Sequence, residues 1–244
     1  MTSKRTAIVL GGSGSVGAAL LRELLRDDGF RAVISLSRRS LPDAVAMARS
    51  EGPALVEKLV PEMVPALLAA ATLDAAREVD GELEGFSVLG VGAGTAKLTL
   101  EEHRAVDVAL NEAFARALRD SGKAPHLAFM TAAGADPAAS ASGSGAAGMS
   151  RYNRVKGEAE EAVRANGPKI VSVFRPAMII GSQHTPWLLE KALPLFSFVT
   201  PAKYKSISVE QIAKAMIATA KHHPGASAIY HYPEMMALIA SGEK

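Results

Sequence analysis

Short apolar runs alternate with longer amphipathic stretches along most of the chain. The runs lie at 6–10, 32–37, 55–60, 86–92, 126–131 and 169–174. Their length and composition are typical of buried strands. Helical patterns lie between them. This alternation predicts an α/β fold, in which helices cover both faces of a parallel sheet.

Two of the helical patterns are well defined. The first covers 16–27, and Gly29 follows it as a stop signal. The second covers 100–120, where Val106, Leu110, Phe114 and Leu118 form an apolar stripe. Thr99 and Glu102 precede that stripe with the spacing of a capping box, which predicts where the helix begins.

A low-complexity stretch, "AAGADPAASASGSGAAG", covers residues 132–148. It has almost no side chain large enough to pack. We therefore expect residues 133–149 to form a mobile loop that acts as a flap over a ligand-binding site.

Composition excludes several classes of protein. The 244 residues include no cysteine, so disulfides and cysteine chemistry are absent, and a cytoplasmic location is expected. The 27 basic and 25 acidic residues leave a net charge of +2, which argues against nucleic-acid and membrane-surface partners. The apolar part of "MTSKRTAIVL" is short for a secretory signal, and we expect no transmembrane helix.

The stretch "TAIVLGGSGSVG" at residues 6–17 joins a predicted strand directly to a predicted helix. Gly11 allows a tight turn, Gly14 lets backbone approach a ligand, and Gly17 lets the helix pack close to the strand. The helix N-terminus would then face a phosphate. The alternative is a purely structural turn. In this context the pattern predicts a dinucleotide-binding, Rossmann-type fold.

The end of the next strand indicates which dinucleotide is bound. Ser37 lies twenty residues after Gly17 and is followed by Arg38 and Arg39, with no acidic residue for a ribose hydroxyl. Paired guanidinium donors suit a 2′-phosphate. The pattern favours NADP(H) over NAD(H), the alternative being a solvated basic loop.

Tyr152 and Lys156 are four residues apart in "SRYNRVKGEAEEAV", so they share one face of a helix. Val155, Ala159 and Val163 form the neighbouring apolar stripe. A lysine ammonium favours the phenolate form of a nearby tyrosine. Tyr152 could therefore exchange a proton with a substrate near neutral pH.

Taken together, these motifs resemble the short-chain dehydrogenase/reductases. The matching pieces are "GGSGSVG", "SRR", "LGVG" (89–92), "FMT" (129–131), "YNRVK" and "FRPAMIIG" (174–181). The pattern "GAD…YNRVKGEAE…VFRP" is similar to the Tat-interacting-protein oxidoreductase group of atypical members. The resemblance spans roughly residues 6–220 and is more specific for fold and cofactor than for substrate.

The resemblance implies a role for each matching position. Tyr152 would be the catalytic acid/base, Lys156 would bind the nicotinamide ribose and tune Tyr152, and Thr131 would bind the substrate oxygen. The cofactor would contact Gly11, Ser13, Gly14, Ser15, Val16, Gly17, Arg38, Arg39, Gly90, Val91, Gly92, Thr131, Tyr152, Lys156 and Pro176.

One departure from the family concerns the substrate oxygen. Relatives tend to carry a second serine where this chain has Ala132, so Ser140, Ser142 or Ser144 could share the role of Thr131. Met178, His184 and Trp187 are candidate pocket residues, with simple packing as the alternative. His222 and His223 suit a helix end better than a metal site, and no metal is expected.

The sequence therefore predicts one Rossmann-type domain over residues 1–244, in which about 180–244 cover the substrate. The predicted function is an NADP(H)-dependent oxidoreductase acting on a carbonyl or alcohol of a small molecule. The alternative is a catalytically weak NADP(H)-binding regulator or assembly factor. The protein could be a monomer or a homodimer.

Overall fold

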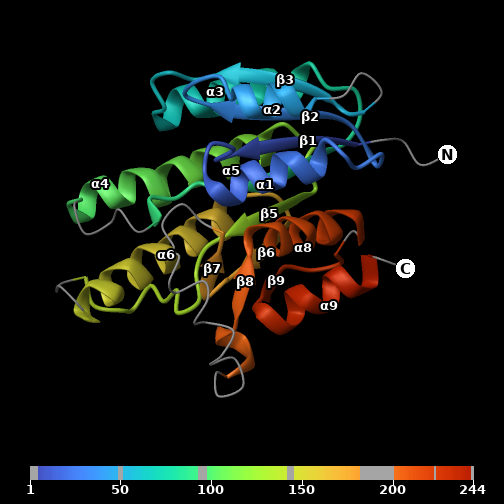
Figure 1. Ribbon diagram of the computed structural model, residues 1–244. Coiled ribbons are helices and arrows are strands. Elements are labelled where there is room, and N and C mark those ends of the chain that lie inside the picture. The colour runs from blue at the N-terminus through green and yellow to red at the C-terminus, as the bar shows by residue number, and fades with distance from the viewer. Residues whose placement is uncertain are drawn as a thin grey trace.

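The computed structural model describes residues 5–48, 52–92, 98–141, 146–181, 201–222 and 224–242. A seven-stranded parallel sheet in the order β3-β2-β1-β4-β5-β6-β9 forms its centre (Figure 1). Its strands are β1 (Arg5–Leu10), β2 (Phe30–Ser37), β3 (Ala54–Leu59), β4 (Leu83–Ser87), β5 (His126–Met130), β6 (Ile170–Phe174) and β9 (Ala228–Tyr230). A separate parallel pair joins β7 (Met178–Ile180) to β8 (Ser206–Ser208).

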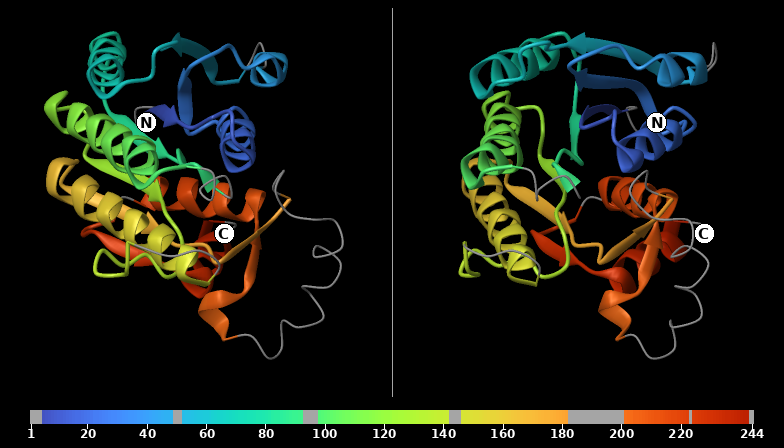
Figure 2. Two further views of the ribbon diagram at one scale, coloured as in Figure 1. Left: turned by 90° about the vertical axis from the view of Figure 1, so that its left-hand side faces the viewer. Right: turned by 60° about the vertical axis from the view of Figure 1, so that its left-hand side comes forward.

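Helices cover both faces of the central sheet, as the sequence predicted. The helices α3, α5 and α6 lie on one face, and α1, α8 and α9 lie on the other (Figure 2). The helical elements are α1 (Ser15–Leu24), α2 (Pro42–Met47), α3 (Pro65–Arg77), α4 (Leu100–Arg104), the π-helical η2 (Ala105–Leu110), α5 (Asn111–Asp120), α6 (Ala146–Asn166), the short 3₁₀ helix η4 (Ala202–Tyr204), α8 (Val209–His222) and α9 (Tyr232–Gly242).

The central strand β1 separates two hydrophobic cores. Ala7 and Val9 pack into the core shared with α1 and α8, while Ile8 and Leu10 pack into the core shared with α3 and α5. All four side chains are fully buried. Successive strand residues point to opposite faces, so an uninterrupted apolar run suits a strand that is covered on both sides.

The strand order creates a switch point at β1. Its neighbours are β2 on one side and β4 on the other, because the chain crosses the sheet after β3. Open α/β sheets bind ligands at the carboxyl ends of the strands beside such a switch point. A ligand site is therefore expected at the residues that follow β1 and β4.

The helix boundaries agree with the sequence patterns in most respects. Thr99 and Glu102 form the predicted capping box, with both reciprocal hydrogen bonds. Leu110, Phe114 and Leu118 are buried, whereas Val106 is only partly buried. The first helix ends at Leu24, earlier than predicted.

The strand predicted at 86–92 was placed too late, because β4 covers Leu83–Ser87. The start of this strand was missed because it contains Glu84, a charged residue whose carboxylate is buried in the structure. Its charge is balanced by Arg5 at 3.4 Å and its oxygen lies 3.2 Å from His126 Nδ1. The strand β9 and the helix α9 were not predicted at all.

The loop predicted at 133–149 needs a correction at both ends, because residues 146–149 already belong to α6 and residues 132–141 are packed. Ala132 and Ala135 are buried, the backbone N–H of Ala133 donates to the carbonyl of Pro176, and that of Asp136 donates to Asn153. The small side chains that suggested a mobile loop instead allow close packing against α6. Residues 142–145 lie outside the described ranges.

Gly157 of α6 explains how closely this loop approaches. A methyl group added at Gly157 would overlap the backbone between Asp136 and Pro137. Glycine within a helix usually costs about 1 kcal/mol relative to alanine. Here it makes room for the loop, whose backbone lies directly on the helix.

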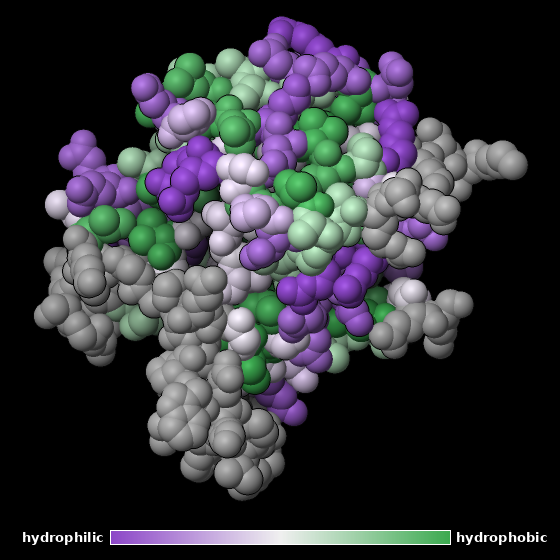
Figure 3. Space-filling view, turned by 45° about the horizontal axis from the view of Figure 1, so that its top comes forward, coloured by the Kyte–Doolittle hydropathy of each residue, from purple (hydrophilic) through white to green (hydrophobic). Residues whose placement is uncertain are grey.

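Hydrophobic and hydrophilic residues are interspersed over the face seen in Figure 3. The large hydrophobic side chains exposed around β3 are Val45, Leu59, Val64 and Leu67. Within the described ranges, no helix is long and apolar enough to cross a membrane.

Candidate functional site

The turn between β1 and α1 is fixed by two glycines. Gly11 has a φ of 94°, and a methyl group there would lie 2.7 Å from the backbone nitrogen of Leu89. A methyl group at Gly17 would overlap the carbonyl oxygen of Gly11. Glycine is therefore required at both positions by the packing of the turn.

The third glycine leaves space for a ligand. Gly14 is the exposed N-cap of α1, and no side chain caps that helix. A methyl group at Gly14 would meet only the carbonyl oxygen of Gly11, at 3.6 Å. Backbone N–H groups and the positive end of α1 thus face an open position, which fits a diphosphate. Ser13 is exposed beside it, whereas the side chain of Val16 is buried in the core.

The end of β2 presents the two arginines to solvent. Arg38 and Arg39 are exposed, and the hydroxyl of Ser37 donates to the carbonyl of Arg39 at 2.8 Å. Glu57, which sequence reasoning missed, accepts from Ser40 Oγ at 2.9 Å and from the N–H of Leu41 at 2.7 Å. Both of its oxygens bind this turn, so Glu57 orders the segment that carries the arginines.

Tyr152 and Lys156 lie one turn apart on α6. The ammonium of Lys156 is 5.4 Å from the centre of the Tyr152 ring. Tyr152 is half-buried, while only 5% of Lys156 is exposed. Val155, Ala159 and Val163 are fully buried as predicted, and they fix this helix against the sheet.

The charge partner of Lys156 is Asp107 in η2, at 3.1 Å between Nζ and Oδ1. The other carboxylate oxygen of Asp107 lies 2.6 Å from His103 Nε2. Burial opposes the charge of Asp107, but Lys156 and His103 outweigh it and hold the pKa of Asp107 below its ordinary value. Burial likewise opposes the charge of Lys156, but Tyr152, Asp107 and Glu160 together raise the pKa of Lys156.

Gly90 covers this ion pair. A methyl group at Gly90 would lie 2.6 Å from both Asp107 Oδ1 and Lys156 Nζ. The backbone N–H of Val91 donates to Asp107 Oδ1 at 3.3 Å. Gly92 has a φ of 61° and open space around it. The "LGVG" segment therefore contacts the ion pair through Gly90 and Val91.

The hydroxyl of Thr131 binds a residue of α6. Thr131 is 3% exposed, and its Oγ1 donates to Glu160 Oε1 at 2.7 Å. Glu160 is also bound by Arg175 through two hydrogen bonds, of 2.8 and 2.6 Å. Pro176 follows Arg175, and its carbonyl accepts from Ala133. To donate a hydrogen bond to a substrate oxygen, the hydroxyl of Thr131 would have to leave Glu160.

The remaining candidates are less informative. Met178 is 42% exposed in β7, and Ser140 already has an interaction partner. Ser142, Ser144, His184, Trp187 and His223 lie outside the described residues. His222 ends α8, and its Nε2 lies 3.3 Å from Ser241 Oγ. The described residues contain no cluster of three or more metal-ligating side chains.

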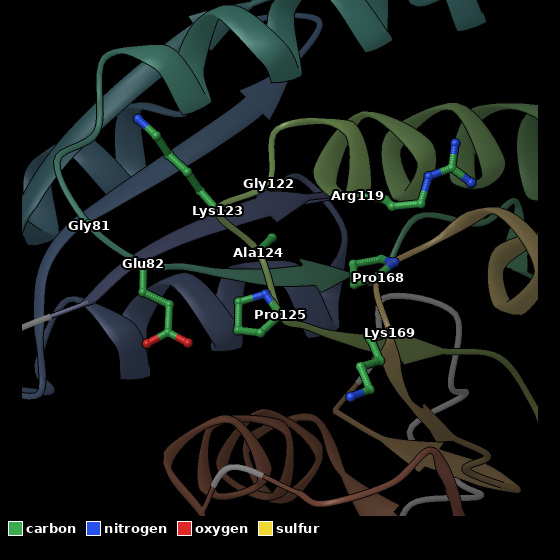
Figure 4. A pocket seen from close by; sticks show the side chains of 9 residues that line it. All are labelled: Gly81, Glu82, Arg119, Gly122, Lys123, Ala124, Pro125, Pro168 and Lys169. Atoms are coloured by element: carbon green, nitrogen blue, oxygen red, sulfur yellow. The ribbon is translucent and has the colours of Figure 1, made fainter.

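A cavity of about 550 Å³ lies at the amino ends of β4, β5 and β6, opposite the carboxyl ends where the glycine turn lies. Its charged side chains, Glu82, Arg119, Lys123 and Lys169, point in different directions (Figure 4). Lys123 is already bound to the carbonyls of Ala76 and Val79. Because these groups do not converge on one point, this cavity is not the candidate site. The candidate site lies at the carboxyl ends of the strands.

Comparison with known proteins shows the fold. A short-chain dehydrogenase/reductase from Serratia marcescens is 19% identical, with a TM-score of 0.65 over 95% of this chain and 98% of that one. The Bordetella bronchiseptica enzyme WbmF, solved with NAD⁺ and UDP, is 16% identical, with a TM-score of 0.59 over 98% of this chain and 77% of that one. The predicted Rossmann-type sheet is confirmed.

Two curated relatives are more similar in sequence. Protein FMP52, mitochondrial, of Eremothecium gossypii is 28% identical over 189 residues, which are 73% of this chain and 68% of the relative. The Aspergillus fumigatus protein of the same name is 27% identical over 185 residues, which are 76% of this chain and 71% of the relative. No family model matches the chain.

These relatives correct one expectation from the sequence. A cytoplasmic location was inferred from the absence of cysteine, yet both curated relatives are named as mitochondrial proteins. The cytoplasmic prediction is therefore wrong, because the absence of cysteine does not determine the compartment in which a protein is located. The narrower resemblance to the Tat-interacting-protein group finds no counterpart in these names and stays a prediction.

Proposed function

We propose that the protein is an NADP(H)-dependent oxidoreductase that acts on a carbonyl or alcohol of a small molecule. The observation that carries the proposal is the adjacency of the glycine turn to the Tyr152–Lys156 pair. Gly11 packs against Leu89, and the next residue, Gly90, packs against Lys156. A cofactor whose diphosphate lies at Gly14 would thus extend toward Tyr152.

The residues present fit a phosphorylated dinucleotide. The uncapped N-terminus of α1 and the open position at Gly14 suit the diphosphate. Arg38 and Arg39 are exposed at the end of β2, where their guanidinium groups could bind a 2′-phosphate. Ser13, Ser15, the backbone of Val16, Val91, Gly92 and Pro176 complete the proposed contacts.

When bound, NADP(H) supplies or accepts the hydride. Tyr152 would hold a proton at its phenolic oxygen and exchange it with the substrate oxygen. Lys156 would favour the phenolate through its charge, since its ammonium lies over the ring. Residues from about 180 onward are proposed to cover the substrate, within one domain.

A second candidate function is an NADP(H)-binding regulator with little turnover. It is favoured by one observation, that the hydroxyl of Thr131 is bound to Glu160 and Ala132 has no hydroxyl to replace it. In that case the cofactor would act as a structural or redox signal. The cofactor site would be the same, and the proton-transfer step would be weak.

The experiment measures NADPH binding by calorimetry and turnover on a panel of aldehydes and ketones. The unmodified protein should bind NADPH and reduce at least one carbonyl. Tyr152→Phe should bind NADPH equally well but lose about a hundred- to ten-thousandfold in turnover, the typical contribution of a general acid. Binding without any turnover would move the regulator ahead, and no NADPH binding would refute both candidates.

A further inference from the structure

Three polar side chains form a buried row beside Lys156. His103, Asp107 and Asn111 follow one another at four-residue intervals through α4, η2 and α5, and none is more than 1% exposed. The amide of Asn111 donates to the carbonyls of Asp107 and Leu89, at 2.8 and 3.3 Å. Its oxygen accepts from Ser87. Asn111 therefore ties η2 to the end of β4.

The π-helical segment turns Asp107 toward α6. One carboxylate oxygen receives Lys156 and the N–H of Val91, and the other lies against His103. Oδ1 thus has two donors, Lys156 and the N–H of Val91, and Oδ2 is in close contact with His103 Nε2 without hydrogen-bond geometry. A buried carboxylate needs such partners, because an unpaired charge in the interior is costly.

His103 connects the same carboxylate to Tyr152. Its ring is fully buried, and it lies nearly parallel to the Tyr152 ring, with centres 6.1 Å apart and planes 23° apart. The row therefore reaches both members of the proposed catalytic pair. Asp107 contacts the lysine, and its partner His103 stacks on the tyrosine.

We propose that Asp107 is a positioning residue that holds the Lys156 ammonium beneath Gly90 and offsets its charge, so that it controls how readily Tyr152 loses its proton. The assignment deepens the proposed function and rests on it for the role of Tyr152. The geometry of the ion pair itself does not depend on turnover.

The sign of the effect follows from the surrounding charges. Among the described residues, the titratable groups that act on the pair are His103 from α4 and Tyr152 and Glu160 from α6. Arg175 already balances Glu160. Asp107 thus balances Lys156, and a carboxylate beside the ammonium weakens its attraction for the phenolate.

The test titrates the phenolate directly in the cofactor-free protein by near-ultraviolet absorbance. The signal of Tyr152 is isolated by subtracting the matching Tyr152→Phe protein in each background, because the chain has 4 tyrosines. The variants are Asp107→Asn, Lys156→Met and the double variant. Glu101→Gln, an exposed charge removed from the same helix as His103, is the control.

Asp107→Asn should move the Tyr152 titration to lower pH by about one unit, the order of size that a nearby charge produces. Lys156→Met should move it to higher pH. The double variant removes both charges and should return close to the unmodified protein, and Glu101→Gln should not shift it. An Asp107→Asn midpoint that is unchanged or higher would overturn the proposal.

Two further features keep the test decisive. If Asp107→Asn does not fold, the comparison of Lys156→Met with the double variant remains, and the proposal requires a lower midpoint in the double variant. A protein that gives these shifts but turns over no carbonyl refutes the proposed enzyme and leaves the assignment of Asp107 intact. Turnover of a carbonyl without these shifts refutes the assignment of Asp107 and leaves the proposed enzyme intact.

Discussion

The hydroxyl of Thr131 donates to the carboxylate of Glu160 at 2.7 Å, beneath α6. We expect Thr131→Val to lower the free energy of unfolding by about 1–2 kcal/mol, because a buried hydrogen bond is lost. Turnover should fall less than about tenfold, well below the loss expected at a proton-transfer residue. Urea unfolding and kcat/KM measure the two effects, with Thr131→Ser as the control. A loss above a hundredfold at unchanged stability would mean that Thr131 contacts the substrate.

Cofactor choice depends on the exposed arginines at the end of β2. Replacing Arg38 and Arg39 together by alanine should weaken NADPH binding by about 1.5–3 kcal/mol, through lost charge-assisted hydrogen bonds. NADH, which lacks the 2′-phosphate, should bind almost unchanged. Calorimetry with both cofactors tests this expectation. Equal affinity of the unmodified protein for NADPH and NADH would rule it out.

The glycine turn allows folding and ligand binding to be tested separately. Gly17→Ala should destabilise the protein by about 1–3 kcal/mol, because the added methyl group overlaps Gly11. Gly14→Ala should destabilise it less, by about 0.5–1 kcal/mol, because its methyl group has room but alanine is a poorer N-cap than glycine. It should nevertheless weaken NADPH binding, because the methyl group would occupy the position proposed for the diphosphate. Thermal unfolding and calorimetry on both variants give the comparison.

Glu84 is a buried carboxylate between Arg5 and His126 at the start of β4. Glu84→Ala should destabilise the protein by about 3–5 kcal/mol, the usual cost of leaving a buried ionic partner uncompensated. Arg5 also donates to the carbonyl of Ala220, so the loss should loosen α8 as well. The exposed neighbour Glu82 provides the control Glu82→Ala. Similar unfolding curves for both variants would contradict the prediction.

The Asp107–Lys156 pair should make stability depend on pH at both ends of the range. The folded pKa of Asp107 lies below its ordinary value of 3.8, so its contribution is present above that value and is lost as pH falls through the folded pKa. The folded pKa of Lys156 lies above 10.5, so its contribution is present below that value and is lost as pH rises through the folded pKa. The stability difference between the unmodified protein and the double variant Asp107→Asn/Lys156→Met should be flat from about pH 5 to pH 9. Urea unfolding across pH measures it.

Local signals in the sequence were sufficient for the elements that they mark. The capping box at Thr99 depends on residues three positions apart, and the stripe that includes Phe114 depends on a helical period. Both were predictable because the interacting residues are close in sequence. The strand β9 has three residues and no alternation, and it forms because β6 offers an edge to pair with. No local pattern could reveal that edge.

The candidate site divides in the same way. The glycine turn and the Tyr152–Lys156 pair have fixed spacings, so they could be recognised from the sequence. The partners of Thr131 and Lys156 come from distant segments and depend on the fold. A signal for Asp107 did exist, since His103, Asp107 and Asn111 recur every four residues next to the apolar stripe. A polar row at that period marks one face of the helix, but whether that face is buried depends on the fold.

The contact between Gly157 and the backbone at Pro137 also limits how this protein can change over evolutionary time. Any side chain at Gly157 would displace the segment that lies on α6 one turn from Tyr152. Substitutions there become acceptable only after that segment has been rebuilt, so the order of mutations matters. Lineages that vary the loop freely should keep this glycine, and those that lose it should carry a loop of different length.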